Sequence, residues 1–277
     1  MKIYNIITYF WHRILHRPIR LKKIYDTKTK KPKLTVIFLH GIAANSSTWR
    51  ATVNILAKNP EFSSVRFIAL DLLGFGKSLK AEWLNYDYDE YDSALNRTIR
   101  HLHIKTPIVL VGHSMGSLIA AVFATNHMDR IAKLILVSPP VLKPAEAASL
   151  PDKFYLKSYS SIHKISNEPA IKALANFVQK VSSFRAEYLN TVAFERSMKN
   201  IVLNPKNYQT YKKLKIPTAI IHGRLDALVM RQNLVEIAKA NSNFITLHQV
   251  IAQHDISPSK RDKIAIELKD FLQNETL

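Results

Sequence analysis

The chain has 277 residues, contains no cysteine and carries a formal net charge of +19 at pH 7. This length suits one large α/β domain with an insertion, and the lack of cysteine excludes disulfides and thiolate metal sites. No run of about 18 apolar residues occurs, so no membrane-spanning segment is predicted, and the cysteine-free composition fits a cytoplasmic protein.

The positive charge is concentrated in two segments. Residues 1–34 contain ten Lys and Arg residues and one acidic residue, and residues 143–214 contain twelve basic and five acidic residues. The rest of the chain is nearly balanced in charge. Because the basic character does not extend over the whole chain, the high isoelectric point does not indicate nucleic-acid binding, and we expect no nucleic-acid partner.

The first segment, residues 1–32, is predicted to be basic and amphipathic. Ile3, Ile7, Phe10 and Ile14 recur at helical spacing, and a proline follows the pattern. One interpretation is a helix that packs this stripe against the protein body or a second subunit. The other is a helix that makes peripheral contact with an anionic membrane, supported by the lysines that follow. A secretory signal is not predicted, because no long apolar stretch and small-residue cleavage site occur.

Strand-like apolar runs then alternate with helical patterns. The predicted strands lie at 19–25, 33–39, 67–70, 107–111, 134–137, 218–222 and 245–251. Nearly continuous apolar strands separated by helices are typical of a mostly parallel sheet that is flanked by helices. The expected fold class is therefore α/β, with a core made of residues 33–142 and 215–277.

Residues 143–214 interrupt this alternation with a helical, lysine-rich sequence. We expect this insertion to form a helical cap over the site. Its aromatic residues either line an acyl pocket or build a small core of the cap itself. They include Phe154, Tyr155, Tyr159, Phe177, Phe184, Tyr188 and Phe194.

The strand at 107–111 ends in Gly112-His113-Ser114-Met115-Gly116, and a helix of small residues follows. A serine at such a strand-to-helix corner needs small flanking residues and exposes its hydroxyl above the carboxyl edge of the sheet. The Met115 N–H then points to where an oxyanion forms. Although Gly-x-Ser-x-Gly also arises by chance, this context favours Ser114 as a nucleophile.

The strand at 33–39 runs into His40-Gly41-Ile42. A loop at this position can offer a backbone N–H to an oxyanion, and Ile42 is the predicted second donor. His40 is interpreted as a structural loop residue, because it precedes the serine in the chain. The glycine-containing loop at 71–78 lacks the spacing of a phosphate-binding loop, so we expect no nucleotide cofactor. No metal-binding motif occurs either, and no metal is expected.

The predicted acid and base follow the last two strands. Asp226 lies three residues past Gly223, at the carboxyl edge of the sheet, although an aspartate there can also cap a helix. Beyond Asp226 only two histidines remain. His248 lies inside a strand, whereas His254 lies in the following loop and can reach back over Ser114. The sequence therefore favours His254 as the base.

Ser114, Asp226 and His254 occur in this order along the chain, each just beyond a predicted strand. With this order, the chain resembles the α/β-hydrolase fold superfamily, in its capped, esterase-like branch, over roughly residues 33–275. The resemblance rests on His40-Gly41, Asp71-x-x-Gly74-x-Gly76-x-Ser78, Gly112-x-Ser114-x-Gly116, His222-Gly223-x-x-Asp226 and His254. Two positions depart from the pattern: Gln253 precedes the base where relatives often have glycine, and Ser117 follows Gly116 where another glycine is common.

The resemblance implies a Ser114–Asp226–His254 triad that hydrolyses a small-molecule carboxylic ester with a small to medium apolar acyl group through an acyl-enzyme. The serine argues against dehalogenases and epoxide hydrolases, which would have aspartate there. Monoglyceride lipases, thioesterases and carbon–carbon hydrolases of ring-cleavage products remain alternatives, because the same triad serves them all. A non-enzymatic ligand receptor is the alternative from a different class.

Overall fold

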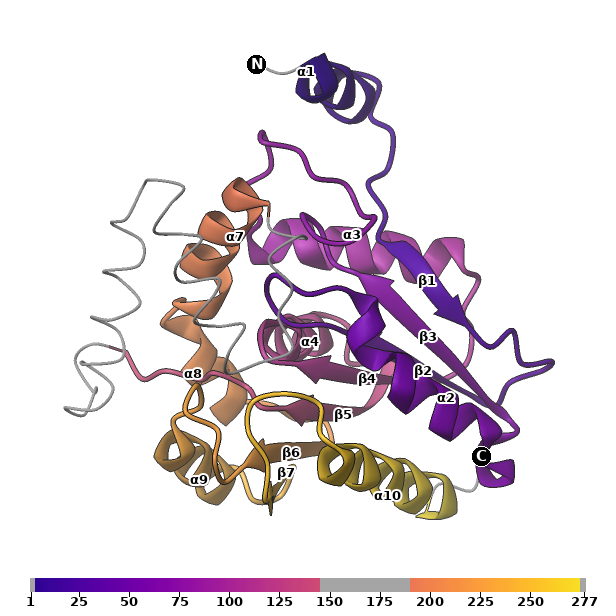
Figure 1. Ribbon diagram of the computed structural model, residues 1–277, viewed down its shortest axis with the longest axis vertical. Helices are drawn as coiled ribbons and strands as arrows, with labels where there is room; N and C mark the ends of the chain where they lie inside the picture. The colour runs from indigo at the N-terminus through magenta and orange to yellow at the C-terminus, as the bar shows by residue number, and fades with distance from the viewer. Residues whose placement is uncertain (1–2, 145–189, 275–277) are drawn as a thin grey trace.

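A seven-stranded sheet organises the computed structural model, which describes residues 3–144 and 190–274 (Figure 1). The strands are β1 (Lys22–Asp26), β2 (Leu34–Leu39), β3 (Val65–Asp71), β4 (Ile108–His113), β5 (Ile131–Val137), β6 (Thr218–Gly223) and β7 (Ile245–Val250). Their order is β1-β3-β2-β4-β5-β6-β7, and only β1 runs antiparallel to its neighbour. The predicted mostly parallel sheet is therefore confirmed.

Helices connect the strands. They are α1 (Ile3–Tyr9), α2 (Arg50–Lys58), α3 (Tyr88–His101), α4 (Met115–Asn126), α7 (Thr191–Ser197), α8 (Lys206–Lys212), α9 (Arg231–Ala240) and α10 (Pro258–Asn274). π-Helical turns at Phe10–Ile14 and Met198–Val202 extend α1 and α7, and 3₁₀ turns lie at Ser46–Trp49 and Pro60–Phe62. In the described ranges no helix is long and apolar enough to cross a bilayer.

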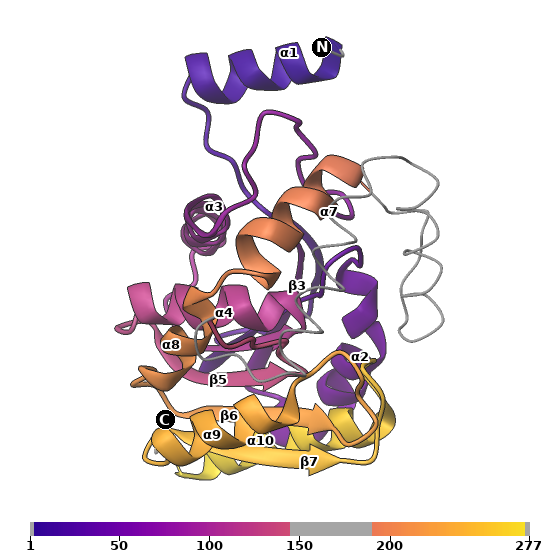
Figure 2. The same ribbon diagram turned by 90° about the vertical axis from the view of Figure 1, so that its left-hand side faces the viewer.

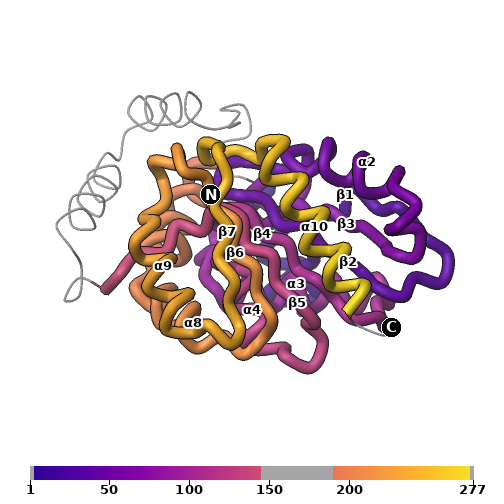
Figure 3. Tube along the Cα trace, turned by 90° about the horizontal axis from the view of Figure 1, so that it is seen from below, coloured from indigo at the N-terminus to yellow at the C-terminus, as the bar shows by residue number. Residues whose placement is uncertain are grey.

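Two apolar clusters cover the two faces of the sheet. One contains buried residues of α3, α4, α8 and α9, and the other contains those of α2 and α10. Figure 3 shows α10 running diagonally across the strands on its face. Every residue of the central strands β2 and β4 is buried, because helices lie on both sides. This rigid centre holds the loops at the carboxyl ends of the strands.

The described end of the predicted insertion, residues 190–214, is helical. Tyr91 of α3 hydrogen-bonds Ser197 through its hydroxyl at 2.9 Å, and Tyr211 of α8 donates to the Ser117 carbonyl of α4 at 3.1 Å. Phe194 is buried. The six aromatic residues named for the insertion between Phe154 and Tyr188 lie outside the described residues. The division into core and cap at 143–214 stays a prediction.

Candidate active site

The corner between β4 and α4 holds Ser114 in a strained backbone conformation, with φ of 52° and ψ of −121°. A Cβ on Gly112 would lie 2.5 Å from the Gly116 carbonyl oxygen, and one on Gly116 would lie 2.5 Å from the His40 carbonyl oxygen. Only glycine fits at these close approaches. The Ser114 N–H donates to the Val137 carbonyl at 2.9 Å, so the neighbouring strand also holds the corner.

The loop after β2 lies directly against this corner. A Cβ on Gly41 would lie 3.1 Å from the Cβ of Ser114, so Ile42 follows a residue that touches the serine. Met115 is the first residue of α4, and its N–H therefore has no acceptor inside the helix. No backbone hydrogen bond from the Ile42 N–H occurs in the described part of the chain. The predicted donors thus flank the corner from two loops, and their joint role stays a prediction.

Asp226 and His254 are brought together from loops that follow β6 and β7. The Nδ1 atom of His254 lies 3.0 Å from each carboxylate oxygen of Asp226, and the Asp226 side chain is fully buried. Because an ionised carboxylate only accepts hydrogen bonds, Nδ1 carries the proton. The other ring nitrogen, Nε2, is left to accept one, as a general base requires.

His113 links the His254 loop to the serine corner. Its Nε2–H donates to the His254 carbonyl at 2.8 Å, and the two imidazole rings lie 5.0 Å apart between centroids. Burial holds the pKa of His113 well below its usual value, so this ring stays neutral. Since His113 directly precedes Ser114, the loop that carries His254 is tied to the serine corner. Within the described residues the Ser114 hydroxyl makes no hydrogen bond.

The carboxylate of Asp226 is stabilised in its charged form. Burial on its own would raise the pKa of Asp226, but the hydrogen bonds from His254 and Ser138 and the charge of Lys260 outweigh it. The resulting pKa is about 2. Asp226 is therefore ionised at neutral pH and able to orient His254.

Lys260 is a member of this cluster that the sequence analysis missed. Its side chain is fully buried, and its ammonium group donates to Ser138 Oγ at 2.8 Å and to the Asp255 and Gln253 carbonyls. Burial lowers its pKa to about 8. A signal was available, because Lys260 lies one helical turn before Ile264 and so shares the inward face of α10.

Other residues of the motifs build the surrounding loops. His40 is buried, and its Nε2 accepts from the Leu72 N–H at 2.9 Å. Asp71 accepts from the Ser46 and Lys77 N–H groups, each at 2.8 Å. His248 of β7 does not contact Asp226; its Nε2 lies 2.7 Å from Oε1 of Glu267. In the described ranges no three His, Cys, Asp or Glu residues could hold a metal ion.

Comparisons with known proteins agree with this architecture. A family model described as the alpha/beta hydrolase fold matches residues 35–163. The probable lysophospholipase BODYGUARD 5 of Arabidopsis thaliana is 36% identical over 113 residues, which is 40% of this chain and 26% of that protein. Alignments with five such plant proteins cover 24–30% of their lengths. Monoacylglycerol lipase ABHD6 of Bos taurus is 24% identical, and the alignment covers 97% of this chain and 86% of that protein.

Solved structures show the same fold over nearly the whole chain. The esterase EaEST from Exiguobacterium antarcticum has a TM-score of 0.70 at 20% identity and covers 93% of this chain and 100% of its own. A bromoperoxidase from Bacillus anthracis has a TM-score of 0.72 at 22% identity and covers 94% of this chain and 98% of its own. With the sheet order and the serine corner described above, these matches show that the chain has the α/β-hydrolase fold.

Proposed function

We propose that this protein is a serine hydrolase that cleaves carboxylic esters with small to medium apolar acyl groups through an acyl-enzyme. The observation that carries the proposal is the buried Asp226–His254 hydrogen bond beside a serine on a strained strand-to-helix corner. Relatives named as lipases and a solved neighbour named as an esterase support ester substrates.

The chemistry follows from the residue types. A serine hydroxyl is a weak nucleophile at neutral pH, so His254 Nε2 takes its proton as Ser114 attacks the ester carbonyl. Asp226 holds the imidazole in the required tautomer and stabilises the imidazolium that forms. The N–H groups of Ile42 and Met115 stabilise the tetrahedral oxyanion, each by about 3 kcal/mol. The imidazolium then protonates the leaving alcohol, and a water activated by His254 releases the acid.

The same residues would serve a monoglyceride lipase, a thioesterase or a carbon–carbon hydrolase. Lipids with one acyl chain are a narrower substrate class to test, because the relatives named above are a probable lysophospholipase and a monoacylglycerol lipase. These remain alternatives within one mechanism. A non-enzymatic receptor is disfavoured, because a ligand receptor has no use for a buried Asp–His pair at a serine corner.

Hydrolysis of p-nitrophenyl butyrate tests the proposal. The wild-type protein should hydrolyse the ester, and Ser114→Ala should lower kcat by about 10³-fold or more. Ser93→Ala on α3, where the residue is half-buried, is the matched control and should retain wild-type kcat. Circular dichroism checks that both variants fold. Near wild-type hydrolysis by folded Ser114→Ala would refute the assignment, and absence of turnover in the wild type on every ester would favour the receptor.

A further inference from the structure

The N-terminal segment presents an apolar surface to solvent. Nine large apolar side chains between Ile3 and Leu15 are 43–76% exposed, with Ile3 and Ile7 the most exposed among them. Elsewhere in the described residues, six exposed large apolar side chains are spread over the chain, at Ile55, Met128, Leu225, Phe244, Ile251 and Ile266. Figure 2 shows α1 lying above the body of the protein rather than within it. A contiguous apolar surface of this kind marks an interaction site.

The polar side of α1 faces the protein. Asn5 is buried, and its Oδ1 accepts from the Glu82 N–H at 2.9 Å. Thr8 Oγ1 accepts from the Trp83 indole N–H at 3.1 Å. The interpretation that the stripe packs against the protein body is therefore wrong. Hydrogen bonds attach the helix to the protein, and its apolar side chains remain exposed to solvent.

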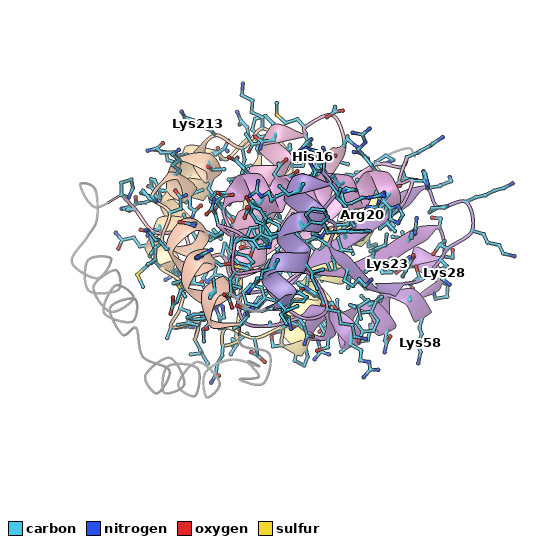
Figure 4. All side chains as sticks on the ribbon, turned by 90° about the horizontal axis from the view of Figure 1, so that it is seen from above. His16, Arg20, Lys23, Lys28, Lys58 and Lys213 are labelled. Carbon is cyan, nitrogen blue, oxygen red and sulfur yellow. The ribbon has the colours of Figure 1, made fainter. Side chains whose placement is uncertain are left out.

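Basic side chains follow this apolar surface in the chain. Arg17, Arg20, Lys22 and Lys28 are exposed, and Arg13 is exposed and paired with Glu90 at 3.3 Å. Figure 4 looks onto this end of the molecule and shows Arg20 to one side of the helix.

The acidic residue of the segment, Asp26, does not offset this charge. Its carboxylate is paired with Arg66 at 2.9 Å and with Lys23 at 2.6 Å. The partner must therefore accept apolar side chains and supply negative charge beside them. A second copy of the chain would bring the same basic residues into contact and be repelled.

We propose that residues 3–15 dock the protein peripherally on anionic lipid surfaces. The helical segment is too short to span a bilayer, so it lies in the plane of the interface with Ile7 and Phe10 among the acyl chains. Tyr4 and Trp11 have the amphipathic rings that suit the headgroup level. The arginines and lysines that follow reach anionic headgroups. This inference is independent of the proposed function, since it concerns binding and not hydrolysis.

Vesicle sedimentation tests the docking directly. The full chain is mixed at low ionic strength with phosphatidylcholine vesicles that contain phosphatidylglycerol, and with phosphatidylcholine vesicles alone. The wild type should bind the anionic vesicles, and added salt should release much of it. Ile7→Glu with Phe10→Glu should lower the partition coefficient about tenfold or more. Ile55→Glu on α2, where the side chain is 56% exposed, is the matched apolar control and should bind as the wild type does.

A charge pair of variants provides the second test. Arg20→Glu should weaken binding to anionic vesicles about fivefold or more. Lys239→Glu makes the same change of charge at the end of α9 and should leave binding unchanged. Equal losses from both variants would mean a nonspecific effect of net charge and would overturn the proposal.

Failure of the wild type to bind, or full binding by the Ile7→Glu and Phe10→Glu variant, would also overturn the proposal. A wild-type dimer in sedimentation velocity that this variant dissociates, without vesicle binding, would show that the surface joins two copies instead. All variants should hydrolyse a soluble ester as the wild type does. A failure of vesicle binding is therefore distinguishable from a failure of the proposed hydrolase function.

Discussion

The ammonium group of Lys260 lies 4.0 Å from Oδ2 of Asp226, and both side chains are fully buried. The same ammonium group donates to the carbonyls of Gln253 and Asp255, which flank His254. One buried cation thus holds the loop of the proposed base and lies beside the proposed acid. We infer that Lys260 positions His254 and Asp226 without touching the substrate.

Lys260→Met should therefore lower kcat about tenfold to a hundredfold, because loss of the hydrogen bonds shifts the His254 loop. The KM should change little, since Lys260 is not expected to contact the ester. Steady-state kinetics on a soluble ester measures both constants. The dependence of kcat on pH gives a second readout. In the wild type, kcat should fall as pH rises through about 8, where buried Lys260 loses its charge. The Lys260→Met variant should not show this fall.

The matched control for this variant is Lys133→Met. Lys133 is also buried, and its ammonium group donates to Oε2 of Glu267 at 2.8 Å, away from the Asp226–His254 pair. Both variants leave a buried partner without its cation, so both should be less stable by about 3–5 kcal/mol. Thermal unfolding measures this loss. An equal fall in kcat in both variants would mean that Lys260 acts only through overall stability.

The depressed pKa of Asp226 predicts a pH-dependent contribution to stability. The folded-state pKa is about 2, below the ordinary value of 3.8. A carboxyl group whose pKa is lower in the folded state stabilises the fold above its unfolded pKa, and this contribution is lost as pH falls through the folded value. The difference in unfolding free energy between the wild type and Asp226→Asn should therefore change by about 2 kcal/mol between pH 5 and pH 2.

Denaturant unfolding at each pH measures this difference. The comparison with Asp226→Asn cancels the other acidic groups that titrate in the same range, such as Glu267, whose pKa is also about 2. A difference that stays constant with pH would contradict the depressed pKa of Asp226.

His254 and His248 make a matched pair of histidine variants. His254→Ala should lower kcat on a soluble ester by about 10³-fold or more, because it removes the proposed base. His248→Ala should keep near wild-type kcat, because that ring lies beside Glu267 rather than Asp226. Parallel kinetics on the two folded proteins checks the assignment. The reverse pattern of activities would place the base on β7.

A series of acyl esters distinguishes the substrate classes. The predicted preference is for small to medium apolar acyl groups, because residues 143–214 are rich in aromatic and aliphatic side chains that suit such groups. The measurement is kcat/KM for p-nitrophenyl esters of increasing chain length, beside a monoacylglycerol, a thioester and a ring-cleavage dienone. A strong preference for the dienone would favour the carbon–carbon hydrolase.

The sequence by itself determined the strands, the serine corner and the order of the proposed catalytic residues. Each of these depends on local patterns: continuous apolar runs predict buried strands, and glycines two positions before and after Ser114 predict a tight corner. The choice of His254 over His248 also needed only the strand boundary. The Asp226–His254 contact then follows, because parallel strands deliver their following loops to one edge of the sheet.

Only the tertiary structure decided which part of the protein, or solvent, each helix face contacts. The apolar stripe of residues 3–14 was visible in the sequence, but periodicity does not tell whether a stripe faces the protein or solvent. The hydrogen bonds from loop 82–83 to Asn5 and Thr8 settle that orientation. Helical spacing likewise places Lys260 on the inward face of α10, but only the fold brings it to Ser138, 122 residues earlier in the chain. Such contacts join segments that are far apart in the sequence, so local sequence patterns do not predict them.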